Sequence, residues 1–213
     1  MRTIAIIQAR TNSTRLPNKV NLPLAGKTMV QNVFERVNRA TMIDDTYIAW
    51  PGQYDCDQND VLKRLLLCAE LYKADRIIRV CADNPCVMAE EIDRVAGHSS
   101  RPFLLNSTAE YPLADHDGFG GELYTMDMLE WMDKHLASHS SYREHPHKLW
   151  VDMSRFYYIG KSYPTGFRLD VNTLEEYKKL KDIFDYFGHN HFTVEEVIEY
   201  LKQKNLEERH ISQ

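Results

Sequence analysis

Three strand-like apolar runs, each followed by a helix-like segment, constrain the fold of this chain more than any other feature. The runs lie at residues 3–8, 46–50 and 76–81, and the helix-like segments lie at 29–39, 61–72 and 89–96. Parallel neighbours in a sheet need helical crossovers, so this alternation predicts a mainly parallel sheet with helices on both faces. We therefore predict an α/β fold with three layers.

The second half of the chain is less regular. Strands are predicted at 103–106, 122–124, 156–159 and 167–171, a loop at 111–121, and helices at 126–136 and after the Thr-x-x-Glu capping boxes at 173 and 193. The polar, histidine-rich stretch 138–148 has the character of an active-site flap or an interface arm rather than of core. With 213 residues the chain is too short for two ordinary domains and a linker, so we expect a single domain over 1–213.

Composition argues against several classes of partner. The net charge is −5 and the pI is near 6.0, whereas binding to a nucleic-acid polymer needs a broad basic surface. The sequence has neither the pattern of a signal peptide nor an apolar run long enough to enter a membrane. We expect a cytoplasmic protein without membrane insertion, in which the four cysteines are buried thiols rather than disulfides.

The segment that follows the first strand is unusually cationic. Arg10, Arg15 and Lys19 occur within eleven residues that also contain Ser13 and no glycine. A solvated basic turn would account for such a cluster by itself. However, open α/β sheets bind ligands at the carboxyl ends of their strands, and guanidinium and ammonium groups suit phosphate oxygens. The cluster alone leaves both readings open, and the features that follow in the chain favour an anion site.

Two common phosphate-binding motifs are excluded. The Gly26-Lys27-Thr28 sequence is similar to the end of a P-loop, but Asn21 stands where that motif needs glycine. No G-x-G-x-x-G dinucleotide motif follows the first strand either. A phosphate ligand would therefore be held mainly by side chains.

A possible metal site follows from three oxygen-bearing side chains. Asp83 comes directly after the third predicted strand, so it should lie at the same sheet edge as the cationic segment. An isolated aspartate at that position is commonly only a turn-former. Asp170 and Asn172 are two residues apart on a predicted strand and hence share one face. Oxygen ligands that converge beside a phosphate suit Mg²⁺.

Taken together, these motifs resemble the cytidylyltransferases that activate sugars. That family includes the CMP-KDO synthetases, the acylneuraminate cytidylyltransferases and the spore-coat polysaccharide biosynthesis proteins, and the spore-coat branch is the most similar. The resemblance rests on residues 6–20, 22–27, 59–64, 79–85, 117–118 with Glu122, 142–145 and 168–176.

The resemblance implies a Rossmann-like nucleotide-diphospho-sugar transferase fold, commonly a homodimer. It also implies Mg²⁺-dependent transfer of CMP from CTP to a sugar for surface polysaccharide synthesis. The nucleotide-binding residues that it implies are Gln8, Ala9, Arg10, Ser13, Arg15, Lys19 and Asp83. Catalytic roles are implied for Arg10, Lys19 and Asp83, and metal binding for Asp83, Asp170 and Asn172. Glu122, Arg143 and His145 are candidates for contact with the sugar.

Two other functions stay open. Asn172 stands where the spore-coat branch usually has aspartate, and the segment 50–60 lacks about a helix and a strand that most members carry. These departures motivate the first alternative, a degenerate member of the family that binds a nucleotide or nucleotide-sugar without turning it over. A glycosyltransferase of related fold is the second alternative, although a sugar diphosphate needs fewer cationic contacts than a triphosphate. Asn12 and Asn18 stand where family members usually have glycine, but asparagine tolerates left-handed backbone angles, so the cationic loop should keep its shape.

Overall fold

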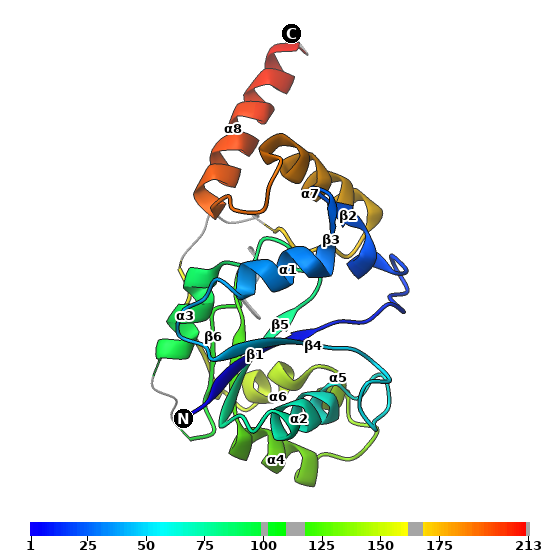
Figure 1. Cartoon of the computed structure of the whole chain (residues 1–213), viewed down its shortest axis with the longest axis vertical. Helices are drawn as coiled ribbons and strands as arrows, with labels where there is room; N and C mark the ends of the chain where they lie inside the picture. The colour runs from blue at the N-terminus through cyan, green and yellow to red at the C-terminus, as the bar shows by residue number, and fades with distance from the viewer. Residues whose placement is uncertain (99–101, 110–117, 162–167, 212–213) are drawn as a thin grey trace.

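The protein is built around one six-stranded sheet with the strand order β4-β1-β5-β7-β6-β8 (Figure 1). The computed structural model describes residues 1–98, 102–109, 118–161 and 168–211, with side chains as far as residue 204. The strands are β1 (Thr3–Gln8), β4 (Asp45–Ala49), β5 (Arg76–Cys81), β6 (Leu105–Ser107), β7 (Glu122–Thr125) and β8 (Phe156–Tyr158). Among these strands only β7 runs antiparallel to its neighbours, so the predicted mainly parallel, mixed sheet is confirmed.

Strand β1 lies inside the sheet and is buried on both faces. It pairs in parallel with β4 on one side and with β5 on the other. Ile4 and Ile6 face one apolar cluster, whereas Ala5 and Ile7 face another, and all four are fully buried. A strand covered on both faces needs a continuous apolar run, and residues 4–7 supply it.

Helices cover both faces of the sheet, which confirms the predicted three layers (Figure 1). The helices on the face of Ala5 and Ile7 are α1 (Met29–Val37) and α3 (Ala89–Gly97). The helices on the face of Ile4 and Ile6 are α2 (Val61–Leu71), α4 (Met126–His135) and α6 (Pro146–Asp152), with the short α5 (Ser141–Glu144) against α2.

A third apolar cluster joins the end of the chain to its beginning. It forms between α7 (Leu174–Phe187), α8 (Val194–Ile211) and the hairpin of β2 (Pro23–Leu24) and β3 (Lys27–Thr28). Leu169 and Val171 are buried in this cluster, and the Val171 N–H donates to the Asp83 carbonyl oxygen at 2.8 Å. The segment before α7 is thereby fixed next to the end of β5.

Two expectations for the second half are wrong. The stretch 138–148 is not a flap, because most of it belongs to α5 and α6, which place Leu149 and Trp150 in the core. The predicted strand at 167–171 is not regular: residue 167 lies outside the described residues, and Arg168 makes only an isolated bridge. The apolar alternation at Leu169 and Val171 serves packing in the third cluster rather than pairing in the sheet.

Three further expectations concern the cysteines, membrane-spanning helices and the loop at 111–121. None of the four cysteines forms a disulfide, as predicted, but only Cys68 and Cys86 are buried, while Cys56 and Cys81 are half-buried. Within the described ranges, no helix has both the length and the apolar character that crossing a membrane requires. Most of the predicted loop at 111–121 lies outside the described residues.

Candidate functional site

A cavity of about 560 Å³ lies at the edge of the sheet where β1 and β5 end. Because β7 runs antiparallel to β5, its first residue, Glu122, lies at the same edge. The cavity brings together residues that are far apart in the chain. The predicted site residues that line it are Gln8, Arg10, Ser13, Arg15, Lys19, Asp83, Glu122, His145, Asp170 and Asn172.

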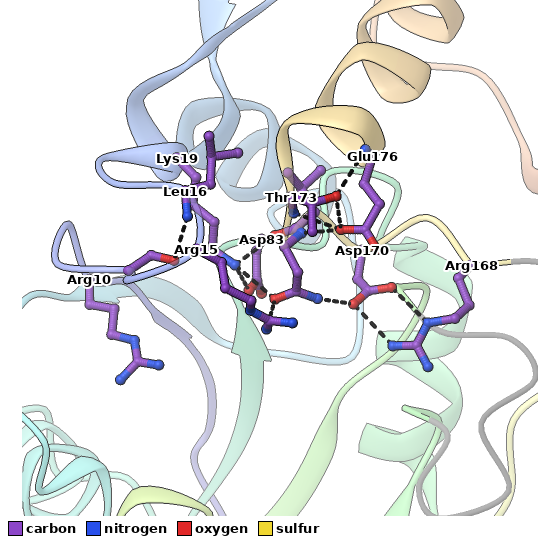
Figure 2. Close-up of polar contacts among 12 residues, drawn as sticks. Arg10, Arg15, Leu16, Lys19, Asp83, Arg168, Asp170, Thr173 and Glu176 are labelled. Carbon is purple, nitrogen blue, oxygen red and sulfur yellow. Dashed lines mark hydrogen bonds and ion pairs between the residues drawn. The ribbon is translucent and has the colours of Figure 1, made fainter.

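Lys19 and Asp83 form the centre of the site (Figure 2). Lys19 begins the short 3₁₀ helix η1 (Lys19–Asn21), preceded by Asn18 in the expected left-handed conformation (φ 56°). Its ammonium donates to Asp83 Oδ2 at 2.6 Å and to the Val171 carbonyl oxygen at 2.6 Å. The Lys19 side chain is 7% exposed, whereas that of Asp83 is 25% exposed. Asp83 is therefore the member of the pair that a ligand can reach.

Asn172 connects the cationic segment to Asp170. Its amide oxygen accepts from Arg15 Nη2 at 2.8 Å and from Lys19 Nζ at 3.1 Å. Its amide nitrogen donates to Asp170 Oδ2, and both Asp170 oxygens accept from Arg168 at 3.1 Å (Figure 2). Cations and carboxylates thus alternate along this side of the cavity.

Arg10 faces a different part of the cavity. In Figure 2 its guanidinium points away from the group around Asp83 and Asp170. It donates to Glu144 Oε1 on α5 at 2.8 Å, with both side chains partly exposed. The three cations of the segment therefore spread along the cavity, as an elongated anion would require.

A buried network lies around Glu122. Arg79 donates to Glu122 Oε1 at 2.7 Å and to Gln8 Oε1 at 2.7 Å, and the Tyr124 hydroxyl donates to Glu122 Oε2 at 2.8 Å. Burial by itself raises the pKa of Glu122, but Arg79, His147 and the Tyr124 hydroxyl outweigh it and hold this pKa below its usual value. Glu122 is therefore ionised at neutral pH.

Two histidines complete this part of the cavity. His147 Nδ1 lies 3.3 Å from Glu122 Oε1. Burial lowers the pKa of His147 to about 4. The negative charge of Glu122 raises this pKa, but by less than burial lowers it. Burial also lowers the pKa of His145, and Lys148 lowers it further. Both imidazoles are neutral at pH 7 and can exchange hydrogen bonds with hydroxyl groups.

Two of the predicted residues do not line the cavity. Ala9 is fully buried, and its N–H donates to the Ala49 carbonyl oxygen. Arg143 is buried and donates to Asp60 and Asp133, so that it ties α5 to α2 and α4. Its contacts are structural, and we do not include it in the site.

Arg79, Glu144 and His147 line the cavity but were not among the predicted site residues. For Arg79 the sequence holds a usable signal, since a charged residue inside the apolar run 76–81 must find a buried partner. Glu144 and His147 carry no such signal, because their roles depend on how α5 and α6 pack.

The donor set suits a hard cation. Asp83, Asp170 and Asn172 offer carboxylate and amide oxygens, which are the ligands that Mg²⁺ prefers. Among the described residues there is no group of three or more His, Cys, Asp or Glu side chains placed to hold a metal. The predicted set contains only two carboxylates, so a bound phosphate would have to supply further oxygens.

Comparison with known proteins extends these observations. A family model described as Cytidylyltransferase matches residues 4–50, which include β1 and all three cations of the segment. The spore coat polysaccharide biosynthesis protein SpsF of Bacillus subtilis is 26% identical over 86% of this chain and 86% of its own length. A 3-deoxy-manno-octulosonate cytidylyltransferase of Pelobacter propionicus is 33% identical over 49% of this chain and 45% of its own length.

Solved structures share the fold. A cytidylyltransferase from Leptospira borgpetersenii has a TM-score of 0.86 at 22% identity, covering 96% of this chain and 95% of that one. A CMP:2-keto-3-deoxy-manno-octonic acid synthetase complexed with CTP has a TM-score of 0.62 at 17% identity, covering 87% of this chain and 99% of that one. The sequence motifs, the matched N-terminal segment and the shared fold agree: the chain is similar to cytidylyltransferases in sequence, and it shares their fold over most of its length.

Proposed function

We propose that this protein transfers CMP from CTP to a sugar, with release of pyrophosphate, in the synthesis of a surface polysaccharide. The observation that carries the proposal is the cavity in which Arg10, Arg15 and Lys19 lie beside Asp83 and Asp170. Guanidinium and ammonium groups are the side chains that bind phosphate oxygens most strongly. The choice of CTP and of a sugar comes from the names of the relatives.

The reaction is a displacement at phosphorus. A hydroxyl oxygen of the sugar attacks the α-phosphorus of CTP, and a new P–O bond forms as the hydroxyl gives up its proton to solvent. The bond from the α-phosphorus to the bridging oxygen breaks, and pyrophosphate leaves with that electron pair. In this proposal Arg10, Arg15 and Lys19 hold the phosphate oxygens in position and offset the charge that develops on them.

We also propose that the reaction depends on Mg²⁺ held by Asp83 and Asp170, with Asn172 as a neutral ligand. A bound divalent cation would supply further neutralisation of the phosphate oxygens. The partly exposed carboxylate of Asp83 supports this role, because it lies beside the cationic segment.

The sugar would occupy the part of the cavity formed by Glu122, Glu144, His145 and His147. These carboxylates and neutral imidazoles suit the hydroxyl groups of a sugar better than they suit phosphates. A homodimer and a cytoplasmic location stay predictions from the sequence.

The test is to measure CTP binding by calorimetry, and pyrophosphate release with Mg²⁺ across a panel of acidic, neutral and amino sugars. We expect Arg15→Gln to weaken CTP binding by about tenfold or more, as loss of a charged hydrogen bond does. Arg155→Gln is the matched control, because Arg155 is exposed and lies outside the cavity lining.

The alternatives give different outcomes. CTP binding without pyrophosphate release for any sugar would support a non-catalytic binding protein. Tighter binding of UDP-sugars than of CTP would support a glycosyltransferase. No CTP binding, or equal effects of the Arg15 and Arg155 substitutions, would overturn the proposal.

A further inference from the structure

The ammonium of Lys19 lies where three oxygen atoms converge. Its Nζ is 2.6 Å from Asp83 Oδ2, 2.6 Å from the Val171 carbonyl oxygen and 3.1 Å from Asn172 Oδ1. An ammonium group has three donors, so every one of them is used. We call these three oxygen atoms the oxygen cage.

The oxygen cage is held together by parts of the chain that do not depend on a ligand. Asp83 follows β5, whereas Val171 and Asn172 precede α7. The Val171 N–H donates to the Asp83 carbonyl oxygen, and the Asn172 N–H donates to Glu176 in the first turn of α7. A carboxylate, a carbonyl and an amide oxygen are also the ligand types that bind a hard divalent cation.

We propose that Lys19 is the resident cation of the oxygen cage in the ligand-free protein and that a divalent metal ion competes with it for Asp83. Lys19 contacts Oδ2 of Asp83, and a metal ion on either oxygen of this small carboxylate would lie close enough to the ammonium for the two cations to repel each other. Asp170, the second proposed ligand, does not remove this competition, because both of its oxygens accept from Arg168 and it cannot replace Asp83 as the stronger ligand in the free protein.

The competition makes Lys19 a positioning residue that links two ligands. This link rests on the proposed function. The phosphate oxygens of a bound nucleotide would attract the Lys19 ammonium and move it away from the oxygen cage. Asp83 is then released for the metal ion, so the nucleotide and the metal each strengthen binding of the other by the same factor. The ligand-free protein would bind divalent metal weakly.

The test uses Mn²⁺ as a spectroscopic probe for Mg²⁺, with the full-length protein and no nucleotide. We expect Lys19→Met to bind Mn²⁺ about tenfold or more tightly than the wild type, within the usual range of coupling between sites. A merely structural role of Lys19 would give the opposite result, because a loosened cage binds metal less well. Asp83→Asn in the same variant should abolish the gain.

Lys27→Met is the matched control, since Lys27 also pairs with a carboxylate, Glu35, but on the surface outside the cavity. Its Mn²⁺ affinity should equal that of the wild type. Should Lys19→Met not fold, the wild type still provides a test. Saturating Mn²⁺ should raise the acetylation rate of Lys19 several-fold, measured by mass spectrometry, and leave that of Lys27 unchanged.

Two results would overturn the proposal: Mn²⁺ affinity in Lys19→Met that is equal to or below the wild-type value, or acetylation of Lys19 that Mn²⁺ does not change. These results are distinct from failure of the proposed function. A protein that binds no CTP but shows the metal competition would refute only the function. Normal CTP binding with unchanged metal affinity would refute only the competition.

Discussion

The contact between Arg10 and Glu144 would oppose binding of the proposed triphosphate in the free protein. The two side chains are 36% and 38% exposed, so their ion pair adds little to the stability of the fold. It does, however, occupy the guanidinium that we assign to the triphosphate. Binding of CTP would have to replace this contact with a phosphate contact.

We expect Glu144→Gln to strengthen CTP binding by roughly two- to fivefold, which matches the small free energy of an exposed ion pair. Calorimetric titration with CTP measures this change. Glu130→Gln is the control, because Glu130 is exposed on α4 and does not line the cavity. Weaker CTP binding in the Glu144 variant would contradict the idea that this pair competes with phosphate.

At the scale of elements, the cap at the N-terminus of α7 also holds a residue of the cavity in place. Thr173 and Glu176 form a reciprocal capping box, as the sequence predicted. Glu176 Oε2 also accepts from the Asn172 N–H at 2.7 Å. The cap therefore fixes the residue whose amide oxygen meets Arg15 and Lys19.

Thr173→Ala should lower the free energy of unfolding by about 1 kcal/mol, the usual cost of losing such a cap. Thr193→Ala is matched to it, since Thr193 and Glu196 form the same reciprocal bonds at the start of α8. Urea unfolding should show similar losses for both variants. Only Thr173→Ala should also weaken CTP binding, and equal CTP affinities would show that the cap does not act on the cavity.

For the molecule as a whole, the buried network at the sheet edge makes stability depend on pH. His147 is packed against Glu122 and Arg79, with His145 and Lys148 nearby, and its pKa is lowered from 6.5 to about 4, mainly by burial. Between these two values the unfolded chain takes up a proton that the folded protein does not. Stability is therefore lost as the pH falls from about 6.5 towards 4. Glu122, whose pKa is also lowered, adds to the loss below about 4.5.

Between pH 7 and pH 4.5 the wild type should lose about 1–3 kcal/mol more stability than His147→Gln, which has no imidazole to protonate. Urea unfolding at both pH values measures the difference. His139→Gln, at an exposed position, should keep the wild-type dependence on pH. Equal pH dependence in the His147 variant and the wild type would show that this imidazole is not responsible.

The sequence by itself determined the alternation of strands and helices in the first half of the chain and the local parts of the site. The βα alternation and the capping boxes at Thr173 and Thr193 follow from patterns within a few residues, whereas the left-handed Asn18 was expected only from the resemblance to a family that has glycine there. The extended segment at Leu169 and Val171 was mistaken for a strand because alternation does not reveal what the buried side packs against.

Only the tertiary structure decided which charges meet. Lys19 is 64 residues from Asp83 and 153 from Asn172, and Arg10 is 134 residues from Glu144. Arg143, expected near the sugar, instead pairs with Asp60 and Asp133. The period of a helix or strand fixes which side chains share a face of one element, whereas contacts between elements depend on strand order and helix packing, which no local pattern encodes.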